Sequence, residues 1–352
     1  MAVHDRRAIL KAMHSSEPLT CASLLLPFAL LLSGCGLVMD AAQLIRPVFA
    51  DEVDAICARQ QLQVGMAIEP RQPFVFPAIW TDEGSRITGL DIELVREITA
   101  TLSAVCGGRA VRPVVRLVHF RDLFVELNEG KVNLFLSAVA GNVPLPVRAG
   151  LAYSTPYFYD GGLGLIAKRP DVVSRLRDRL RPAADRLVTP PTVRTALAGL
   201  SVAVQEGTSA QLYAEAHLKD SRLVLCDSLP AAFESLDPSV DVILSKEPIL
   251  SFITGRVRRD WQVLGIEPGK TLLLNREHYG VVMAEESYRL RRLVNDVLFQ
   301  LDASGRLAEM RRRWLLDSYA FPRRAAAEGL PFAVEKMVAQ QYQGECRWAA
   351  TP

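Results

Sequence analysis

Apolar and polar residues follow each other along this chain in blocks, and two kinds of block occur twice. Residues 121–137 read RDLFVELNEGKVNLFLS, and residues 229–245 read LPAAFESLDPSVDVILS. Each has a short amphipathic helical pattern, a turn and then a continuous apolar run, which predicts a buried strand. Residues 62–70 (LQVGMAIEP) and 200–208 (LSVAVQEGT) predict a further strand ahead of each block. Two repeats in the same order predict two α/β lobes of similar design, with a cleft between them for a small molecule.

The periodicity also predicts how the first lobe is built. Asp91 stands where an N-cap is expected, ahead of apolar residues at helical spacing. The whole series is a strand at 62–68, a helix at 92–103, a strand at 114–118, a helix at 122–129 and a strand at 132–137. Such a series predicts a parallel sheet. A final helix at 306–314 is expected to pack on this first lobe.

These blocks set the expected boundaries of the lobes. Lobe 1 comprises residues 57–162 and 278–316, and lobe 2 comprises residues 163–277. Within lobe 2, the basic stretch 169–199 is predicted to form an inserted solvated helix and loop. Gly162 and Gly164 are interpreted as flexible residues near a crossing between the lobes, because no helix directly follows them as a dinucleotide fingerprint requires. Residues 317–352 form a C-terminal appendage without an assigned role.

The N-terminus has the pattern of a targeting segment, assigned to residues 1–35. Basic residues precede an apolar run, and Leu-Ser-Gly-Cys within that run resembles a bacterial lipobox ending at Cys35. Ordinary signal cleavage after Ala50 is an alternative, and an uncleaved anchor is another because the run is about 19 residues long. All three place the rest of the chain in the periplasm or cell envelope, and lipidation adds an anchor in the membrane.

An oxidising location makes the other cysteines candidates for disulfide bonds. Cys57 precedes the first strand, and Cys106 follows the first helix. Since a strand and its following helix run antiparallel, both residues fall at the same end of the layer, and we predict a Cys57–Cys106 disulfide. A Cys226–Cys346 bond follows only by elimination, with buried free thiols as the alternative.

Composition and charge narrow the class of function. The 352 residues have a formal net charge of +2, which argues against a dedicated nucleic-acid binder. The chain contains no HExxH, no Gly-x-Ser-x-Gly elbow and no P-loop, and its five histidines are scattered. The sequence therefore predicts neither a metal site nor an enzyme.

A set of segments in a fixed order resembles the family 3 solute-binding proteins, the polar amino-acid binding proteins of ABC importers. The segments are LQVGMAIEPRQPFVF, ITGLDIELVREI, LFVELNEGKVNLFLSAVA, YSTPYFYDGGLGLIAK, LSVAVQEGTSAQLY, VDVILSKEP and YGVVM. The resemblance implies a two-lobed α/β fold of the type II periplasmic-binding-protein kind, hinged around a cleft between the lobes, and it implies no cofactor. The expected partners are a small-molecule ligand and an ABC permease or membrane sensor, and the protein is expected to be a monomer.

The resemblance also implies binding residues, and the chain departs from the family pattern at several of them. Lys246 stands where the family has an Asp that pairs with the ligand amine, and Arg71 replaces an aromatic residue before Pro-Phe. Arg148, in a loop that is longer than usual, is the candidate for the Arg that holds the ligand carboxylate. The Gly-Thr-Ser stretch that survives can donate hydrogen bonds to an anion. The full set of ligand-binding candidates is Glu69, Arg71, Ser137, Arg148, Thr208, Ser209 and Lys246.

Each candidate also has a simpler structural explanation. Lys246 and Arg71 can be solvated surface charges and not ligand contacts. Glu69 can pair with Arg71, and Thr208 and Ser209 can cap the helix that follows them.

These departures predict an exported solute-binding protein whose ligand is anionic or lacks a free amine, because Lys246 would repel an ammonium group in a closed cleft. Two other functions stay open. One is an accessory protein with a degenerate pocket. The other is an enzyme similar to the cyclohexadienyl dehydratases, which have a carboxylate beside the Gly-Thr loop, where this chain has Ser209 and Ala210.

Overall fold

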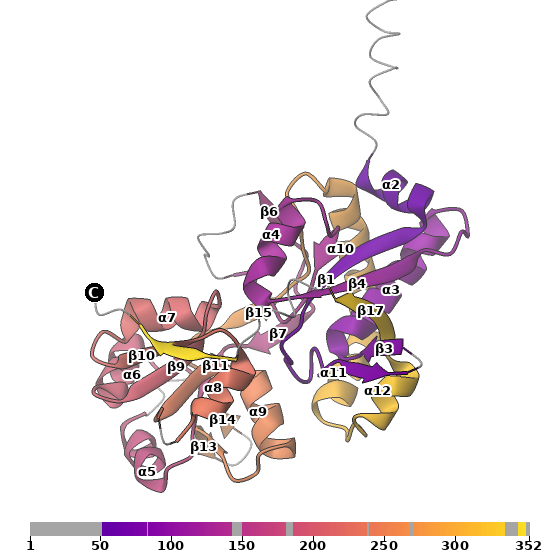
Figure 1. The fold of residues 1–352 in the computed structure, drawn as a ribbon. Coiled ribbons are helices and arrows are strands. Elements are labelled where there is room, and N and C mark those ends of the chain that lie inside the picture. The colour runs from indigo at the N-terminus through magenta and orange to yellow at the C-terminus, as the bar shows by residue number, and fades with distance from the viewer. Residues whose placement is uncertain are drawn as a thin grey trace, which may run out of the picture. The chain divides into compact units, whose positions relative to one another are not determined.

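The computed structural model describes residues 51–82, 84–142, 150–180, 186–237, 239–267, 270–334 and 344–349. Residues 51–352 form one compact unit, which is built mainly from two β-sheets and the helices that flank them (Figure 1). The lobe boundaries given above stay a prediction, because the structure groups this whole range together. Cys35 and the apolar run around it lie outside the described residues, as does Arg148.

The larger sheet contains the predicted parallel strands. Its strand β1 buries Leu62, Val64 and Met66 and pairs in parallel with β4 on one side and β5 on the other. This confirms the β-α-β-α-β prediction. The order across the sheet is β2 (Ile79–Thr81), β3 (Gly84–Ile87), β17 (Leu330–Val334), β4 (Arg112–Val118), β1 (Gln61–Ala67), β5 (Leu134–Phe135), β16 (Val282–Ala284) and β6 (Leu151–Tyr153).

Helix α3 (Leu90–Val105) buries Leu94, Val95 and Ile98 against this sheet. Its N-cap is Gly89, so the prediction that Asp91 caps the helix is wrong. Asp91 is buried in the first turn, and its carboxylate accepts a hydrogen bond from the backbone N–H of Ala138 at 3.0 Å. The carboxylate therefore serves a partner after strand β5 instead of its own helix.

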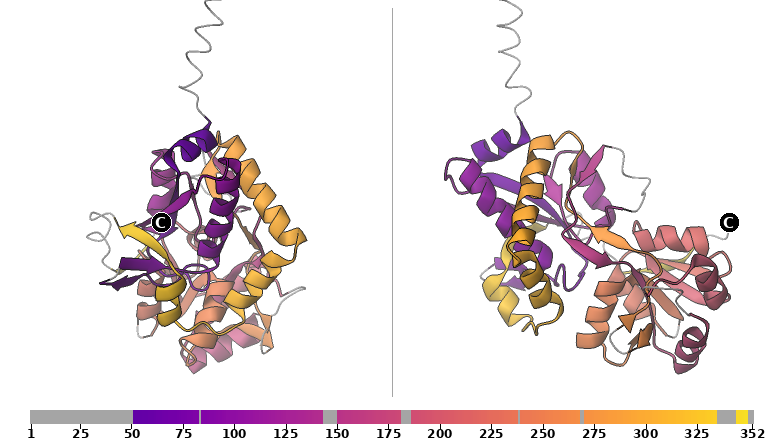
Figure 2. Two further views of the ribbon diagram at one scale, coloured as in Figure 1. Left: turned by 90° about the vertical axis from the view of Figure 1, so that its right-hand side faces the viewer. Right: turned by 180° about the vertical axis from the view of Figure 1, so that it is seen from behind.

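In the described part of the chain, six further helical segments flank the larger sheet. Helix α10 lies beside both α3 and α11 (Figure 2), and α11 contacts α3, as predicted for the helix at 306–314. The segments are α2 (Glu52–Arg59), the short 3₁₀ helix η2 (Phe120–Asp122), α4 (Leu123–Asn128), α10 (Tyr288–Ala303), α11 (Arg306–Leu315) and α12 (Arg323–Glu328).

The smaller sheet holds the second repeat. Its order is β12 (Gln262–Val263), β8 (Leu163–Ala167), β11 (Val242–Lys246), β9 (Ser201–Gln205), β10 (Arg222–Cys226) and β18 (Cys346–Trp348). Its helices are α5 (Pro170–Arg179), α6 (Pro190–Leu197), α7 (Ser209–His217), α8 (Leu229–Ser235) and α9 (Glu247–Arg256). The predicted inserted segment thus forms α5 and α6, and α5 is amphipathic, with Val172, Val173 and Leu176 buried.

Two short strands from distant parts of the sequence pair antiparallel where the chain passes from the larger sheet to the smaller one. Strand β7 (Phe158–Gly161) pairs with β15 (Glu277–Tyr279), and β8 of the smaller sheet begins two residues after β7 ends. Gly162 lies at this passage, where a Cβ would come within 2.4 Å of the carbonyl oxygen of Asn275. Only glycine permits so close an approach. A second small pairing joins β13 (Gly265–Glu267) to β14 (Lys270–Thr271).

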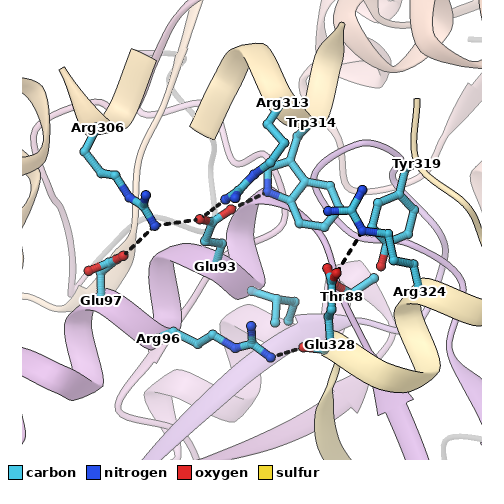
Figure 3. A pocket seen from close by; sticks show the side chains of 11 residues that line it. Thr88, Glu93, Arg96, Glu97, Arg306, Arg313, Trp314, Tyr319, Arg324 and Glu328 are labelled. Atoms are coloured by element: carbon cyan, nitrogen blue, oxygen red, sulfur yellow. Dashed lines mark hydrogen bonds and ion pairs between the residues drawn. The ribbon is translucent and has the colours of Figure 1, made fainter. Parts of the chain in front are cut away.

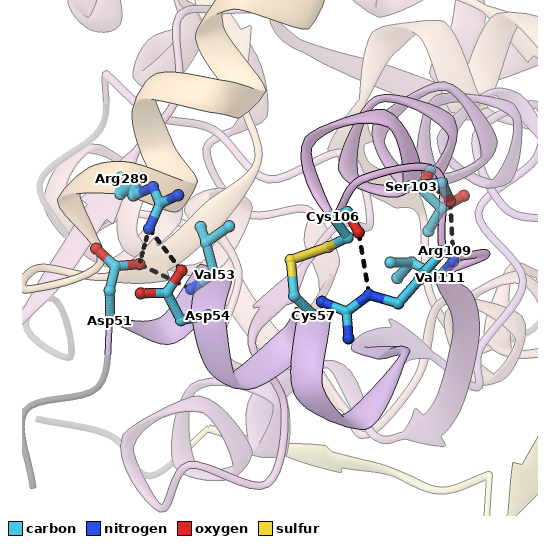
Figure 4. The surroundings of a disulfide bond; sticks show 10 residues. Asp51, Val53, Asp54, Cys57, Ser103, Cys106, Arg109, Val111 and Arg289 are labelled. Carbon is cyan, nitrogen blue, oxygen red and sulfur yellow. Dashed lines mark hydrogen bonds and ion pairs between the residues drawn. A yellow bond between two sulfur atoms is a disulfide. The ribbon is translucent and has the colours of Figure 1, made fainter. Parts of the chain in front are cut away.

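Both predicted disulfides are present. Cys57 of α2 is bonded to Cys106 at the end of α3 (Figure 4). Cys226 of β10 is bonded to Cys346 of β18. The segment after residue 316, which the sequence left unassigned, therefore joins both sheets, because β17 pairs with β4 and β3 while β18 pairs with β10.

Candidate functional site

The predicted site residues lie where strands of the two sheets end. Glu69 and Arg71 follow β1, Ser137 follows β5, Thr208 follows β9, and Lys246 is the last residue of β11. In α/β sheets, ligands bind beyond the carboxyl ends of the parallel strands. All five residues are buried, so the interpretation of Arg71 and Lys246 as solvated surface charges is wrong.

Arg71 is a buried guanidinium that contacts strand β9 and the helical segment η2. It is 1% exposed, its Nη2 donates a 2.7 Å hydrogen bond to the side-chain oxygen of Gln205, and its Cζ lies 4.0 Å from the ring centroid of Phe120. Burial lowers the pKa of Arg71 to about 10, so the side chain stays charged at neutral pH. Its buried Nε has no hydrogen-bond partner within the described part of the chain. The guanidinium therefore keeps a donor for a further acceptor.

Glu69 does not form the expected hydrogen-bonded pair with Arg71. Its carboxylate accepts a 3.1 Å hydrogen bond from the backbone N–H of Phe120 and a 3.4 Å bond from the side-chain amide of Gln205. It also lies 3.1 Å from Nδ1 of His119, and this contact raises the pKa of the His119 ring. Glu69 is thus linked to Arg71 through Gln205, which hydrogen-bonds to both side chains. Its negative charge also favours the charged form of Arg71.

Lys246 forms a buried ion pair that the sequence analysis missed. Its Nζ lies 2.6 Å from a carboxylate oxygen of Glu277, donates to the hydroxyl of Ser209 at 3.3 Å, and lies 4.6 Å from the ring centroid of Tyr279. The side chains of Lys246 and Glu277 are 4% and 0% exposed. In the sequence, Glu277 is marked only by its place directly before the predicted lobe boundary at residue 278. The cation at 246 is therefore neutralised by the protein itself.

The groups predicted to bind an anion make hydrogen bonds within the protein, the Ser137 hydroxyl as an acceptor and the Thr208 hydroxyl and the Gly207 N–H as donors. The Ser137 hydroxyl accepts a hydrogen bond from the backbone N–H of Ala67 at 2.8 Å, and the Thr208 hydroxyl donates to the carbonyl of Gln205 at 2.7 Å. The backbone N–H of Gly207 donates to the side chain of Gln211. Thr208 is the N-cap residue of α7 without making a side-chain capping bond.

Asp91 adds a carboxylate that sequence reasoning had placed elsewhere. Burial raises its pKa to about 7, and the hydrogen bond from Ala138 and the charge of Arg71 only partly oppose this effect. Together, Arg71 and Lys246 face Glu69, Glu277 and Asp91, so the site is not richer in cations than in carboxylates. A ligand at this position would have to replace some of the hydrogen bonds within this network, because the charged groups are already paired with one another.

Among the described residues, no group of three or more His, Cys, Asp or Glu side chains is arranged to hold a metal. Within the same residues, no helix combines the length and the apolar character needed to cross a membrane.

Comparisons with known proteins agree on the fold. The family model of the bacterial extracellular solute-binding proteins, family 3, matches residues 64–317. One similar solved structure is a mutant of ArgBP from T. maritima, with 23% identity over 74% of this chain and 98% of that chain and a TM-score of 0.58. A second is the substrate-binding protein AbpA from Streptococcus pneumoniae bound to L-arginine, with 23% identity over 73% of this chain and 95% of that chain and a TM-score of 0.57. A third is the ancestral amino-acid-binding protein AncCDT-1, a precursor of cyclohexadienyl dehydratase, with 19% identity over 75% of this chain and 100% of that chain and a TM-score of 0.58. No curated protein sequence gives a significant match.

Proposed function

The chain belongs to the bacterial extracellular solute-binding proteins, family 3, and on that premise we propose that it captures a small carboxylate ligand that lacks a free amine. The protein then presents the ligand to an ABC permease or a membrane sensor. We further propose that it does so as a monomer held in the cell envelope by a lipid at Cys35, without a cofactor.

The buried Lys246–Glu277 pair is the observation that carries this proposal. The family resemblance places a carboxylate for the ligand amine at position 246, and this chain has an ammonium there, held 2.6 Å from Glu277. The protein thus supplies its own ammonium group at the place where an amino acid would bring one. A ligand ammonium entering beside it would have to compete with Lys246 for Glu277 while lying next to a like charge in a desolvated site, and this competition disfavours ligands with a free amine.

Arg71 is proposed as the partner of the ligand carboxylate, together with Arg148. The buried Nε of Arg71 is a donor without an acceptor among the described residues, and a carboxylate accepts two parallel hydrogen bonds from a guanidinium. Binding would replace the neutral Gln205 as the principal partner of this cation. The ligands named for the similar structures are not carried over, since identities of 23% or less speak for the fold alone.

We propose a binding protein and not an enzyme. The dehydratase resemblance requires a carboxylate beside the Gly-Thr loop, where this chain has Ser209 and Ala210. The Ser209 hydroxyl is bonded to Lys246, so neither residue supplies a general acid or base of that kind.

Titration calorimetry with matched pairs of ligands tests the proposal. Each pair joins an α-amino acid to its 2-hydroxy analogue, for example L-glutamate and 2-hydroxyglutarate or L-alanine and L-lactate. We expect at least one hydroxy acid to bind at least tenfold more tightly than its amino partner. Tighter binding of the amino acids, or no binding of any carboxylate, would overturn the proposal, and the second result would favour an accessory protein with a degenerate pocket.

A charge reversal sharpens the test. The variant Lys246→Asp/Glu277→Gln places a carboxylate at position 246 without a second one beside it, and we expect the preference to shift toward amino acids. The matched control is Lys219→Gln, which lowers the net charge by one as the double variant does, because Lys219 is exposed and follows the end of α7, away from the site. Equal shifts in both variants would show that overall charge, and not position 246, sets the preference.

A further inference from the structure

A cavity of about 310 Å³ lies between α3, α11 and the segment that contains α12, apart from the residues of the site above. Figure 3 shows charged side chains around it and aromatic rings along one wall. It is lined by Thr88, Ile92, Glu93, Arg96, Glu97, Arg306, Arg313, Trp314, Tyr319, Arg324 and Glu328.

Glu93 fixes one wall of this cavity. Its carboxylate accepts a 2.6 Å hydrogen bond from the indole N–H of Trp314, pairs with Arg313, and lies 3.5 Å from Arg306. The Trp314 ring packs against Tyr319 with centroids 4.9 Å apart. These contacts hold two aromatic rings in place beside the apolar side chain of Ile92, which gives the cavity a preformed apolar surface.

The arginines around the cavity differ in their ion pairs. Arg306 lies within 4 Å of Glu93, Glu97 and Glu309, Arg313 pairs with Glu93, and Arg324 pairs with Glu328 at 2.8 Å. Arg96 donates to the backbone carbonyl of Glu328, and no carboxylate within the described part of the chain pairs with it. Its remaining guanidinium donors are therefore available to an anion.

The cavity depends on a segment that the family model does not cover. Tyr319, Arg324 and Glu328 follow residue 317, where the family match ends. This segment is held in place because β17, directly after α12, pairs with β3 and β4. The cavity is thus a feature of this chain's C-terminal part and not of the ligand cleft that the family shares.

We propose that this cavity is a second binding site for a small monocarboxylate with a flat apolar body. The carboxylate pairs with Arg96 at the rim, and the body packs against Trp314 and Tyr319. The volume lies at the lower end of the range of about 300–1,000 Å³ that is typical of small-molecule sites, which fits a ligand with a single ring. A carboxylate is required because Arg96 has no carboxylate partner among the described residues, and an apolar body is required because the inner wall is aromatic and aliphatic.

Benzoate is the probe for this proposal, used with the full chain. Trp314 lines the cavity and donates to Glu93, so its indole N–H resonance, assigned by comparison with Trp314→Phe, reports occupancy directly. We expect benzoate to move this resonance saturably, with a dissociation constant that calorimetry reproduces. Benzyl alcohol, which keeps the ring but lacks the carboxylate, should bind at least tenfold more weakly.

Two matched variants locate the carboxylate. Arg96→Gln removes the cation that is proposed to pair with the carboxylate and should weaken benzoate binding at least tenfold. Arg312→Gln is the control, because Arg312 is an exposed arginine of α11 that pairs with Asp317 and does not line the cavity. The proposal is overturned if benzoate leaves the Trp314 resonance unchanged at millimolar concentration, or if the two variants bind benzoate equally well.

Discussion

Replacing Lys246 with methionine tests the energetic weight of the buried ion pair with Glu277. The two charged groups lie 2.6 Å apart and are almost fully buried. At this separation and an effective dielectric constant of about 20, their attraction is about 6 kcal/mol. Desolvation of each ion offsets several kcal/mol of this gain, so the intact pair contributes little net stability.

The variant Lys246→Met changes this balance, because it removes one partner and leaves the other buried. Glu277 would keep a 3.3 Å hydrogen bond from the side chain of Asn275 but would lose its counter-ion. We expect the free energy of unfolding to fall by about 3–5 kcal/mol. In the double variant Lys246→Met/Glu277→Gln no charge is left unpaired, and we expect most of the loss to be recovered.

Urea denaturation followed by tryptophan fluorescence, with the disulfides intact, supplies the four free energies of this double-mutant cycle. An exposed pair of similar length is the control: Arg194 and Asp220 lie 2.7 Å apart, and both side chains are 50% exposed. Arg194→Gln should cost less than about 1 kcal/mol. The reasoning is refuted if Lys246→Met costs no more than Arg194→Gln, or if the double variant loses as much as the two single variants added together.

Three other predictions concern stability and anchoring. Burial raises the pKa of Asp91 to about 7 from 3.8; between these values the unfolded chain releases a proton that the folded chain keeps, so stability falls as pH rises. Asp91→Asn should remove this loss. The free energy of unfolding of the variant minus that of the wild type should therefore rise by up to about 4 kcal/mol from pH 4 to pH 7.5, and the same difference at both pH values would contradict this. The Cys226–Cys346 bond closes a loop with a sequence separation of 120 residues, so replacing both cysteines with serine should lower the free energy of unfolding by about 2–5 kcal/mol in urea titrations; a variant as stable as wild type would argue against this. Cys35→Ser should release the protein from membranes or block its processing, and unchanged mass and fractionation would rule out lipidation.

The elements that local patterns predicted correctly are those whose cause is local. The apolar runs that became β1, β5, β9 and β11 were identifiable because a buried strand needs continuous apolar residues whatever lies next to it. The Cys57–Cys106 bond was also predicted, from the opposite directions of one strand and the helix after it, although Cys57 lies in helix α2, which the sequence pattern did not predict. Asp91 shows the limit of the same reasoning. An Asp at the start of a helical pattern is a common N-cap, and nothing nearby in the sequence reports that Ala138 needs its carboxylate.

The sequence by itself determined which residues carry charge beyond the strand ends, including Arg71 and Lys246, and that the chain has the alternating pattern of a two-sheet α/β protein. Only the tertiary structure decided which partners neutralise these charges. Gln205 lies 134 residues from Arg71, and Glu277 lies 31 residues from Lys246. Side-chain periodicity encodes which face of an element is buried, but a hydrogen bond between the ends of different strands depends on how the elements are brought together. For the same reason the sequence did not predict a role for the C-terminal segment, because its strands β17 and β18 pair with strands that lie far away in the sequence.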